Sequence, residues 1–82
     1  MKHLDGSEIR LIRRTAGLTQ AEFGNRIGLS YSTISKIERG DLAATEETVS
    51  HICRVFNVDK ERLRALKSAV KPFGEGGGLR WR

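Results

Sequence analysis

The sequence predicts an all-α domain of five short helices over residues 1–72, followed by a flexible glycine-rich C-terminal tail over residues 73–82. Apolar residues recur at spacings of three and four along the first 72 residues, which is the period of a helix with one buried face. Capping residues and glycines divide this stretch into segments of helical length. No sustained alternation of apolar and polar residues, the pattern of a half-buried strand, occurs before the last few residues.

The first helix is expected to begin after Asp5, because Asp5 and Glu8 have the spacing of a capping box. Gly17 can adopt the left-handed conformation that commonly ends a helix. The residues that should line its buried face are Ile9, Ile12 and Ala16.

Residues 19–27 and 30–39 are predicted to form two helices joined by a tight turn. Thr19 and Glu22 make a second capping box, Gly28 can end the first of these helices, and Ser30 can cap the second. The inward-facing residues are Phe23, Ile27, Leu29, Ile34 and Ile37. Two short helices with such a turn form a helix-turn-helix, whose second helix fits the major groove of DNA.

Gly24 stands in the middle of the helix predicted over residues 19–27. A glycine in a helix interior costs roughly 1 kcal/mol relative to alanine. We therefore expect another backbone segment to pass too close to Gly24 for a Cβ atom.

Two further helices complete the predicted domain. Thr45 can cap the fourth, whose apolar face is Val49, Ile52, Cys53 and Phe56. Asp59 can cap the fifth, and Pro72 is expected to end it because proline lacks the backbone N–H that a helix uses. The apolar side of the fifth helix consists of Leu63, Leu66 and Val70.

Residues 20–39 resemble the helix-turn-helix of the Cro and C1-type repressors, the XRE family. Counting from Gln20, that family has apolar residues at places four, eight, ten, fifteen and eighteen, which correspond here to Phe23, Ile27, Leu29, Ile34 and Ile37. It also has a small residue at place five and glycine at place nine, matched by Gly24 and Gly28. The resemblance extends from Ile9 to Val58 and implies a lambda-repressor-like DNA-binding domain.

The resemblance implies that Tyr31, Ser32 and Lys36 face base edges, with Ser35 beside them as a further base-reading candidate. Lys36 can donate to guanine O6 or N7, whereas a serine hydroxyl hardly discriminates among bases. Gln20 would contact a phosphate from a helix N-terminus, where free N–H groups favour anions. The further phosphate candidates are Thr33 and Arg39. The alternative is that these side chains are simply solvated and that Arg39 is favoured there by the helix dipole.

Arg13 and Glu38 match the positions of an ion pair that joins the first and third helices in this family. Loss of one partner of a buried pair costs about 3–5 kcal/mol, so this role would be structural. The loop after the third helix departs from the family pattern, because Asp41 is acidic where many phage repressors are basic. We therefore expect electrostatic anchoring from Arg10, Arg14 or the tail.

The net charge of +5 lies in the C-terminal part of the chain. Residues 1–59 contain eight basic and eight acidic residues, whereas residues 60–82 contain seven basic residues and two acidic ones. Within the neutral part, residues 8–40 are basic and residues 41–59 are acidic. Such polarity favours one face toward a polyanion, although charge alone fits a solvated surface equally well.

The tail has an unusual composition, GEGGG followed by LRWR. A glycine-rich stretch cannot offset the entropy of ordering, so we expect it to be flexible. Leu79–Arg82 holds the single tryptophan between two arginines. It is interpreted as a disordered basic end, a nonspecific DNA arm or a docking strand for a partner protein.

Other classes of protein are not indicated. No apolar run approaches the ~20 residues that span a bilayer, and the N-terminus has no apolar stretch of signal-peptide type. The single Cys53 cannot form an intramolecular disulfide, which fits a reducing cytosol. His3 and His51 are too few for a metal site or a Cys–His nucleophile. We expect a cytoplasmic protein that is not an enzyme and has no cofactor, metal or membrane partner.

These observations predict a sequence-specific double-stranded DNA-binding transcriptional regulator, expected to be a repressor that occupies its operator as a homodimer. The exposed edge of the fifth helix, at Leu63, Leu66 and Val70, is the expected dimer interface unless these residues close the monomer core. Two alternatives stay open. One is an antitoxin-type protein whose tail binds a partner protein, and the other is a restriction–modification controller.

Overall fold

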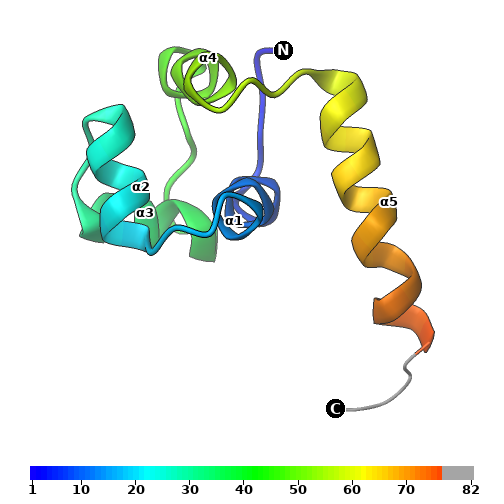
Figure 1. The fold of residues 1–82 in the computed structure, drawn as a ribbon. Coiled ribbons are helices and arrows are strands. Elements are labelled where there is room, and N and C mark those ends of the chain that lie inside the picture. Colours follow the sequence, from blue (N-terminus) through cyan, green and yellow to red (C-terminus); the bar gives the residue numbers. More distant parts are fainter. Residues whose placement is uncertain (77–82) are drawn as a thin grey trace.

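The computed structural model describes residues 1–76, with side chains through residue 69. This part of the chain forms five α-helices and no strand (Figure 1). The helices are α1 (Gly6–Thr15), α2 (Gln20–Ile27), α3 (Tyr31–Arg39), α4 (Glu46–Val55) and α5 (Lys60–Gly76). The predicted all-α, five-helix class is therefore confirmed. The predicted tail segment Leu79–Arg82 lies outside the described residues.

The predicted capping boxes are both present. Asp5 accepts a hydrogen bond from the Glu8 backbone N–H at 2.8 Å, and the Glu8 carboxylate accepts one from the Asp5 N–H at 2.9 Å. Thr19 and Glu22 exchange the same two bonds at 3.1 and 2.9 Å. These reciprocal bonds satisfy N–H groups that the first turn of a helix leaves without partners, and they fix where α1 and α2 begin.

The core lies between α1, α2, α3 and α4, and the first turns of α5 close it. The Phe23 and Phe56 rings stack with their centroids 4.9 Å apart, which links α2 to the end of α4. Leu4, which precedes α1, is 2% exposed, although the sequence offered no pattern that marked it. Ala16, predicted to line the buried face, is instead the exposed C-cap residue of α1. The buried apolar residues are Leu4, Ile9, Ile12, Phe23, Ile27, Ile34, Ile37, Val49, Ile52, Val58 and Leu63.

Gly24 packs against backbone, as its position in mid-helix predicted. A Cβ atom there would overlap the carbonyl oxygen of Leu29, in the turn between α2 and α3. The same turn places Gly28 at φ +77°, in the left-handed region that glycine adopts without strain. Both glycines are therefore required by the tight joint between the two helices.

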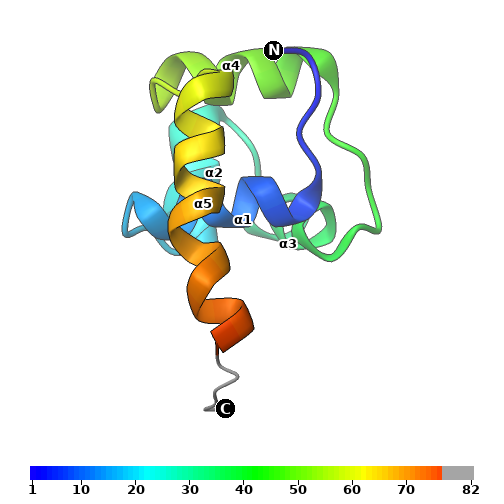
Figure 2. The same ribbon diagram turned by 90° about the vertical axis from the view of Figure 1, so that its right-hand side faces the viewer.

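The fifth helix differs from its prediction in two respects. Its backbone continues through Pro72 to Gly76, so the expectation that Pro72 ends it is wrong. Pro72 has no backbone N–H to donate to the Ser68 carbonyl four residues earlier. Because Ser68 is exposed, this carbonyl can bind water instead. Figures 1 and 2 show that the C-terminal end of α5 projects beyond the other helices.

The second difference concerns the apolar side of α5. Leu63 is buried in the core and Leu66 packs against it, so neither residue forms an exposed edge. The expected dimer interface at these two leucines is therefore wrong, because both side chains belong to the monomer core, where α5 packs against α1. The side chain of Val70 is outside the described residues.

Candidate nucleic-acid interface

Helix α3 exposes one face and buries the other. Ile34, Ile37 and Glu38 point into the domain, while the Tyr31 residue is 58% exposed. Ser32 and Lys36 are also exposed, and Ser35 is half-buried. The structure thus brings all four predicted base-reading residues onto one short helix whose opposite face is anchored in the core.

The first turn of α3 carries a small cluster of hydroxyl groups. The Ser30 Oγ accepts from the Thr33 N–H at 3.3 Å, which caps the helix. The same oxygen lies 3.0 Å from the Thr33 Oγ1 and 3.4 Å from the Ser32 Oγ. The hydroxyls of Ser32 and Thr33 are therefore held near the free N–H groups of the helix N-terminus, where an anion is favoured.

The predicted ion pair is present and is part of a larger network around Glu38. Arg13 donates from Nε to Glu38 Oε2 at 2.7 Å and from Nη2 to Oε1 at 3.0 Å. Oε1 also accepts from Arg10 Nε at 3.5 Å and from Gln20 Nε2 at 3.1 Å. The Glu38 side chain has no exposed surface. One carboxylate therefore ties α3 to both α1 and the start of α2.

The pKa of Glu38 reflects this network. Burial alone raises the pKa, but the hydrogen bonds from Arg13, Gln20 and Arg10 and the charge of Arg13 hold it below its ordinary value of 4.5. The same hydrogen bond raises the pKa of Arg13. Both groups are thus ionised, as a buried pair must be to avoid a stranded charge.

This network also constrains two residues that the sequence assigned to DNA. Gln20 stands at the first position of α2, and its amide nitrogen is bound to Glu38, which leaves one of its two amide hydrogens for another acceptor. The Nε of Arg10 donates to Glu38, while the Arg10 side chain is still 44% exposed, so its role in anchoring DNA stays a prediction. Arg14 is exposed.

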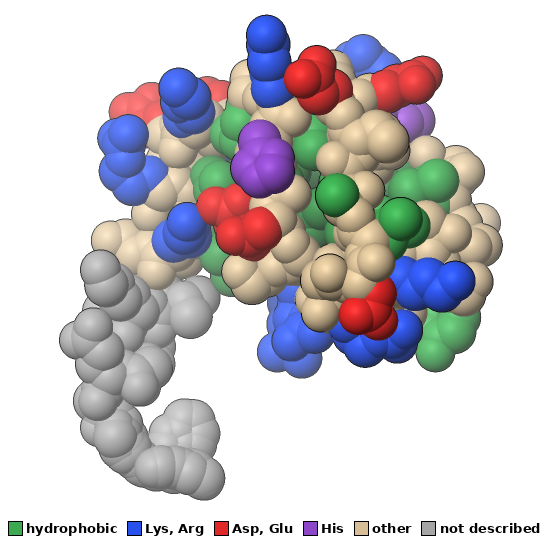
Figure 3. Space-filling view, turned by 180° about the vertical axis from the view of Figure 1, so that it is seen from behind, with side chains coloured by type: hydrophobic (Ala, Val, Ile, Leu, Met, Phe, Trp, Pro, Cys, Tyr) green, Lys and Arg blue, Asp and Glu red, His purple; other side chains and the backbone are tan. Residues whose placement is uncertain are grey.

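Arg39, at the end of α3, forms hydrogen bonds with two neighbouring side chains. Its Nε donates to Asp41 Oδ2 at 3.0 Å, and its Nη1 donates to Ser35 Oγ at 3.0 Å. The sequence marked Asp41 as an unusual acidic residue but gave no sign of this pairing. Basic side chains gather along the lower edge of the body in Figure 3, the edge at which α1 and α3 lie in Figure 1.

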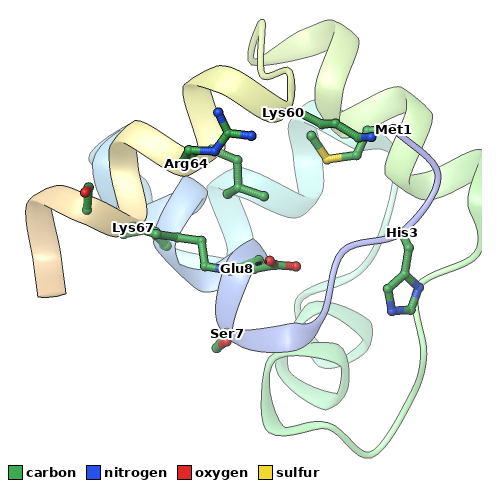
Figure 4. A pocket seen from close by; sticks show the side chains of 10 residues that line it. Met1, His3, Ser7, Glu8, Lys60, Arg64 and Lys67 are labelled. Atoms are coloured by element: carbon green, nitrogen blue, oxygen red, sulfur yellow. Dashed lines mark hydrogen bonds and ion pairs between the residues drawn. The ribbon is translucent and has the colours of Figure 1, made fainter.

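An open groove of about 810 Å³ lies on a different surface, between α1, α5 and the N-terminal segment (Figure 4). Leu11 and Leu63 line it, and the Lys67 Nζ crosses it to Glu8 Oε2 at 2.9 Å. This pair raises the pKa of Lys67 and joins α5 to α1. None of the predicted DNA-contacting residues lines the groove, so we interpret it as the seam between two packed helices.

Among the side chains of residues 1–69, which the structure describes, no cluster of three or more histidine, cysteine or acidic groups is placed to hold a metal ion. Cys53 packs against the core, as predicted, and burial raises the pKa of its thiol. None of the helices in the described part of the chain is both long and apolar enough to cross a membrane.

Comparison with known proteins identifies the family. A helix-turn-helix domain model matches residues 6–66. Uncharacterized HTH-type transcriptional regulator y4dJ of Sinorhizobium fredii is 34% identical over 74 residues, which are 90% of this chain and 95% of that protein. Uncharacterized HTH-type transcriptional regulator YazB of Bacillus subtilis is 31% identical over 58 residues, which are 71% of this chain and 84% of that protein.

Longer relatives match over part of their length. Antitoxin PezA of Streptococcus pneumoniae is 38% identical over 53 residues, 65% of this chain but 34% of the antitoxin. The matched segment thus spans about a third of that relative. No solved structure matches significantly. The chain therefore belongs to the helix-turn-helix domain family, among HTH-type transcriptional regulators.

Proposed function

We propose that this chain is a sequence-specific double-stranded DNA-binding transcriptional regulator of the Cro/C1 (XRE) type. The observation that carries the proposal is α3, a nine-residue helix with Ile34 and Ile37 anchored in the core and an exposed polar face. At about 1.5 Å per residue this helix is about 13 Å long, comparable with the width of the major groove. The seven-position pattern of residues 20–39 supports the Cro/C1 assignment.

The contacts divide into base readout and phosphate anchoring. Tyr31, Ser32 and Lys36 read base edges, and Ser35 joins them from its half-buried position. The phosphate contacts come from Gln20, Thr33 and Arg39. Gln20 suits this role because it stands at the N-terminus of α2 and keeps one amide hydrogen while Glu38 holds its side chain in place.

The regulator acts as a homodimeric cytoplasmic repressor by occupying its operator. A single α3 reads too few base pairs for specificity, so two copies place their helices in successive major grooves about 34–36 Å apart. Leu63 and Leu66 serve the monomer core, so the contact between copies uses other surfaces. No catalytic step is part of this mechanism.

Selection of duplexes from a random DNA pool tests the proposal. We expect enrichment of a sequence with two related half-sites, bound by two copies of the chain. If a dimer neutralises roughly 6–10 phosphates, affinity should fall ~10³–10⁵-fold between 50 and 200 mM salt. A pool without enrichment would contradict sequence-specific binding, and an affinity independent of salt would contradict the proposed phosphate contacts.

The antitoxin alternative is favoured by one observation, the 38% identity to Antitoxin PezA over 53 residues. In this alternative the helix-turn-helix binds DNA while Leu79–Arg82 holds a partner protein. Co-purification of a partner with the full chain, and its loss from a chain ending at residue 76, would support it. Equal recovery of the partner with the shortened chain would exclude Leu79–Arg82 as its binding segment.

A further inference from the structure

The Asp41 carboxylate is bound to Arg39, which is a candidate for phosphate contact. Arg39 has a side chain that is 56% exposed, yet its guanidinium is bound at two places. Nε donates to Asp41 and Nη1 donates to Ser35, both at 3.0 Å. These bonds use two of the five guanidinium N–H donors. A DNA phosphate that approaches the Nε edge competes with the Asp41 carboxylate, because arginine binds carboxylate and phosphate oxygens in the same geometry.

The backbone, and not the ion pair, fixes where Asp41 stands. Gly40 takes φ +87°, its N–H donates to the Ile37 carbonyl at 3.1 Å, and the Asp41 N–H donates to the Lys36 carbonyl at 2.9 Å. These are the two bonds of a Schellman motif, which ends a helix in a fixed geometry. The Asp41 backbone is therefore held beside the last turn of α3 whether or not Arg39 is bound to its carboxylate.

We propose that Asp41 competes with DNA phosphate for Arg39. This inference rests on the proposed function and adds a residue that controls it. A phosphate that binds the Arg39 Nε must first separate this pair, and the Asp41 carboxylate beside the DNA backbone repels phosphate in either case. Because an exposed ion pair is weak and screened by salt, DNA can break it.

The effect is therefore a reduction of affinity for every duplex, whatever its sequence. Neither Arg39 nor Asp41 needs to contact a base for this reduction. Asp41 is in this sense a positioning residue that acts through Arg39. The opposite possibility is that Asp41 orients Arg39 toward the phosphate and so strengthens binding. The two possibilities predict opposite changes in DNA affinity when the Asp41 charge is removed.

The test is a double-mutant cycle on the full chain, with Asp41→Asn and Arg39→Gln singly and together. Asp41→Asn keeps the size of the side chain and removes its charge. Its affinity for a duplex of random sequence should rise about two- to tenfold at low salt, with a salt slope steeper by about one unit per chain. In the Arg39→Gln background the same change should produce a much smaller gain. Glu61→Gln, an equal charge change on α5, is the control and should change affinity little.

Three results would overturn the inference. A loss of affinity in Asp41→Asn would mean that Asp41 orients Arg39 productively. If Asp41→Asn raises DNA affinity equally with and without Arg39, Asp41 acts only by repelling the DNA with its own charge. No DNA binding by the unaltered chain would overturn the proposed function together with this inference, whereas the first two results leave that function intact. If Asp41→Asn changes the melting temperature, Asp41→Ser repeats the cycle.

Discussion

Arg13 and Glu38 join α1 to α3 through two hydrogen bonds of 2.7 and 3.0 Å, at a site where the Glu38 side chain has no exposed surface. Glu38 lies on the helix that bears the proposed base-reading residues, and it also holds Gln20 at the start of α2. The orientation of α3 is thus coupled to the integrity of one buried carboxylate. Stability and DNA binding should therefore change together when this network is altered.

The first prediction concerns the strength of this pair. Arg13→Ala should lower the free energy of unfolding by about 3–5 kcal/mol, because it leaves Glu38 buried without its main partner. Urea unfolding followed by circular dichroism measures the change. Arg14→Ala removes the neighbouring exposed arginine and should stay within about 0.5 kcal/mol of the unaltered chain. Equal effects of the two changes would contradict a dominant role for the pair.

The second prediction concerns pH. The pKa of Glu38 in the folded protein lies below its ordinary value of 4.5, so its contribution to stability is fully present above that pH. This contribution is lost as the pH falls through the folded pKa, because the unfolded chain then binds more protons. Unfolding free energies measured from about pH 6 to pH 2 should show a fall that is shallower in Glu38→Gln. The same slope in both proteins would contradict the assignment.

The third prediction concerns Gly24. Alanine in a helix interior is normally favoured over glycine by roughly 1 kcal/mol, but a Cβ at residue 24 would overlap the Leu29 carbonyl. Gly24→Ala should therefore destabilise the domain in thermal unfolding. Asn25→Ala, at the next and exposed position of α2, should be neutral or slightly stabilising. A stabilised Gly24→Ala would show that the turn between α2 and α3 yields easily.

The fourth prediction separates base readout from phosphate contact. Lys36→Ala should relax preference at particular operator positions by about 1–3 kcal/mol per lost base contact. Arg39→Ala should weaken all duplexes alike. Binding to a panel of single-base operator variants measures both effects, and Arg54→Ala removes an exposed cation of α4 as the control. A uniform loss in Lys36→Ala would reassign Lys36 to phosphate contact.

The fifth prediction concerns the segment beyond α5. A chain ending at residue 76 loses Arg80 and Arg82, and should keep its melting temperature and its preferred DNA sequence. Its salt slope should decrease by about one to two units per chain if these arginines contact phosphate. A large loss of stability would mean that the segment packs as part of the fold.

The local features of this protein could be predicted from its amino-acid sequence. The capping boxes at Asp5 and Thr19 join groups three residues apart, so they depend on neither the packing of the domain nor its topology. The helix-turn-helix could be predicted for the same reason, because its glycines and apolar positions lie within twenty consecutive residues. Even the close backbone approach at Gly24 was predictable, since the contact comes from five residues ahead.

Contacts between groups far apart in the sequence could not be predicted in this way. Glu38 accepts from donors 18, 25 and 28 residues away, and it thereby binds Gln20 and Arg10, which the sequence had assigned to DNA. The burial of Leu4 and Leu63 likewise depends on how the N-terminal segment and α5 cover the other helices. Spacing along a chain identifies the face of a helix on which a side chain lies. The residue that this side chain contacts on another helix depends on how whole helices pack, and local spacing does not encode that packing.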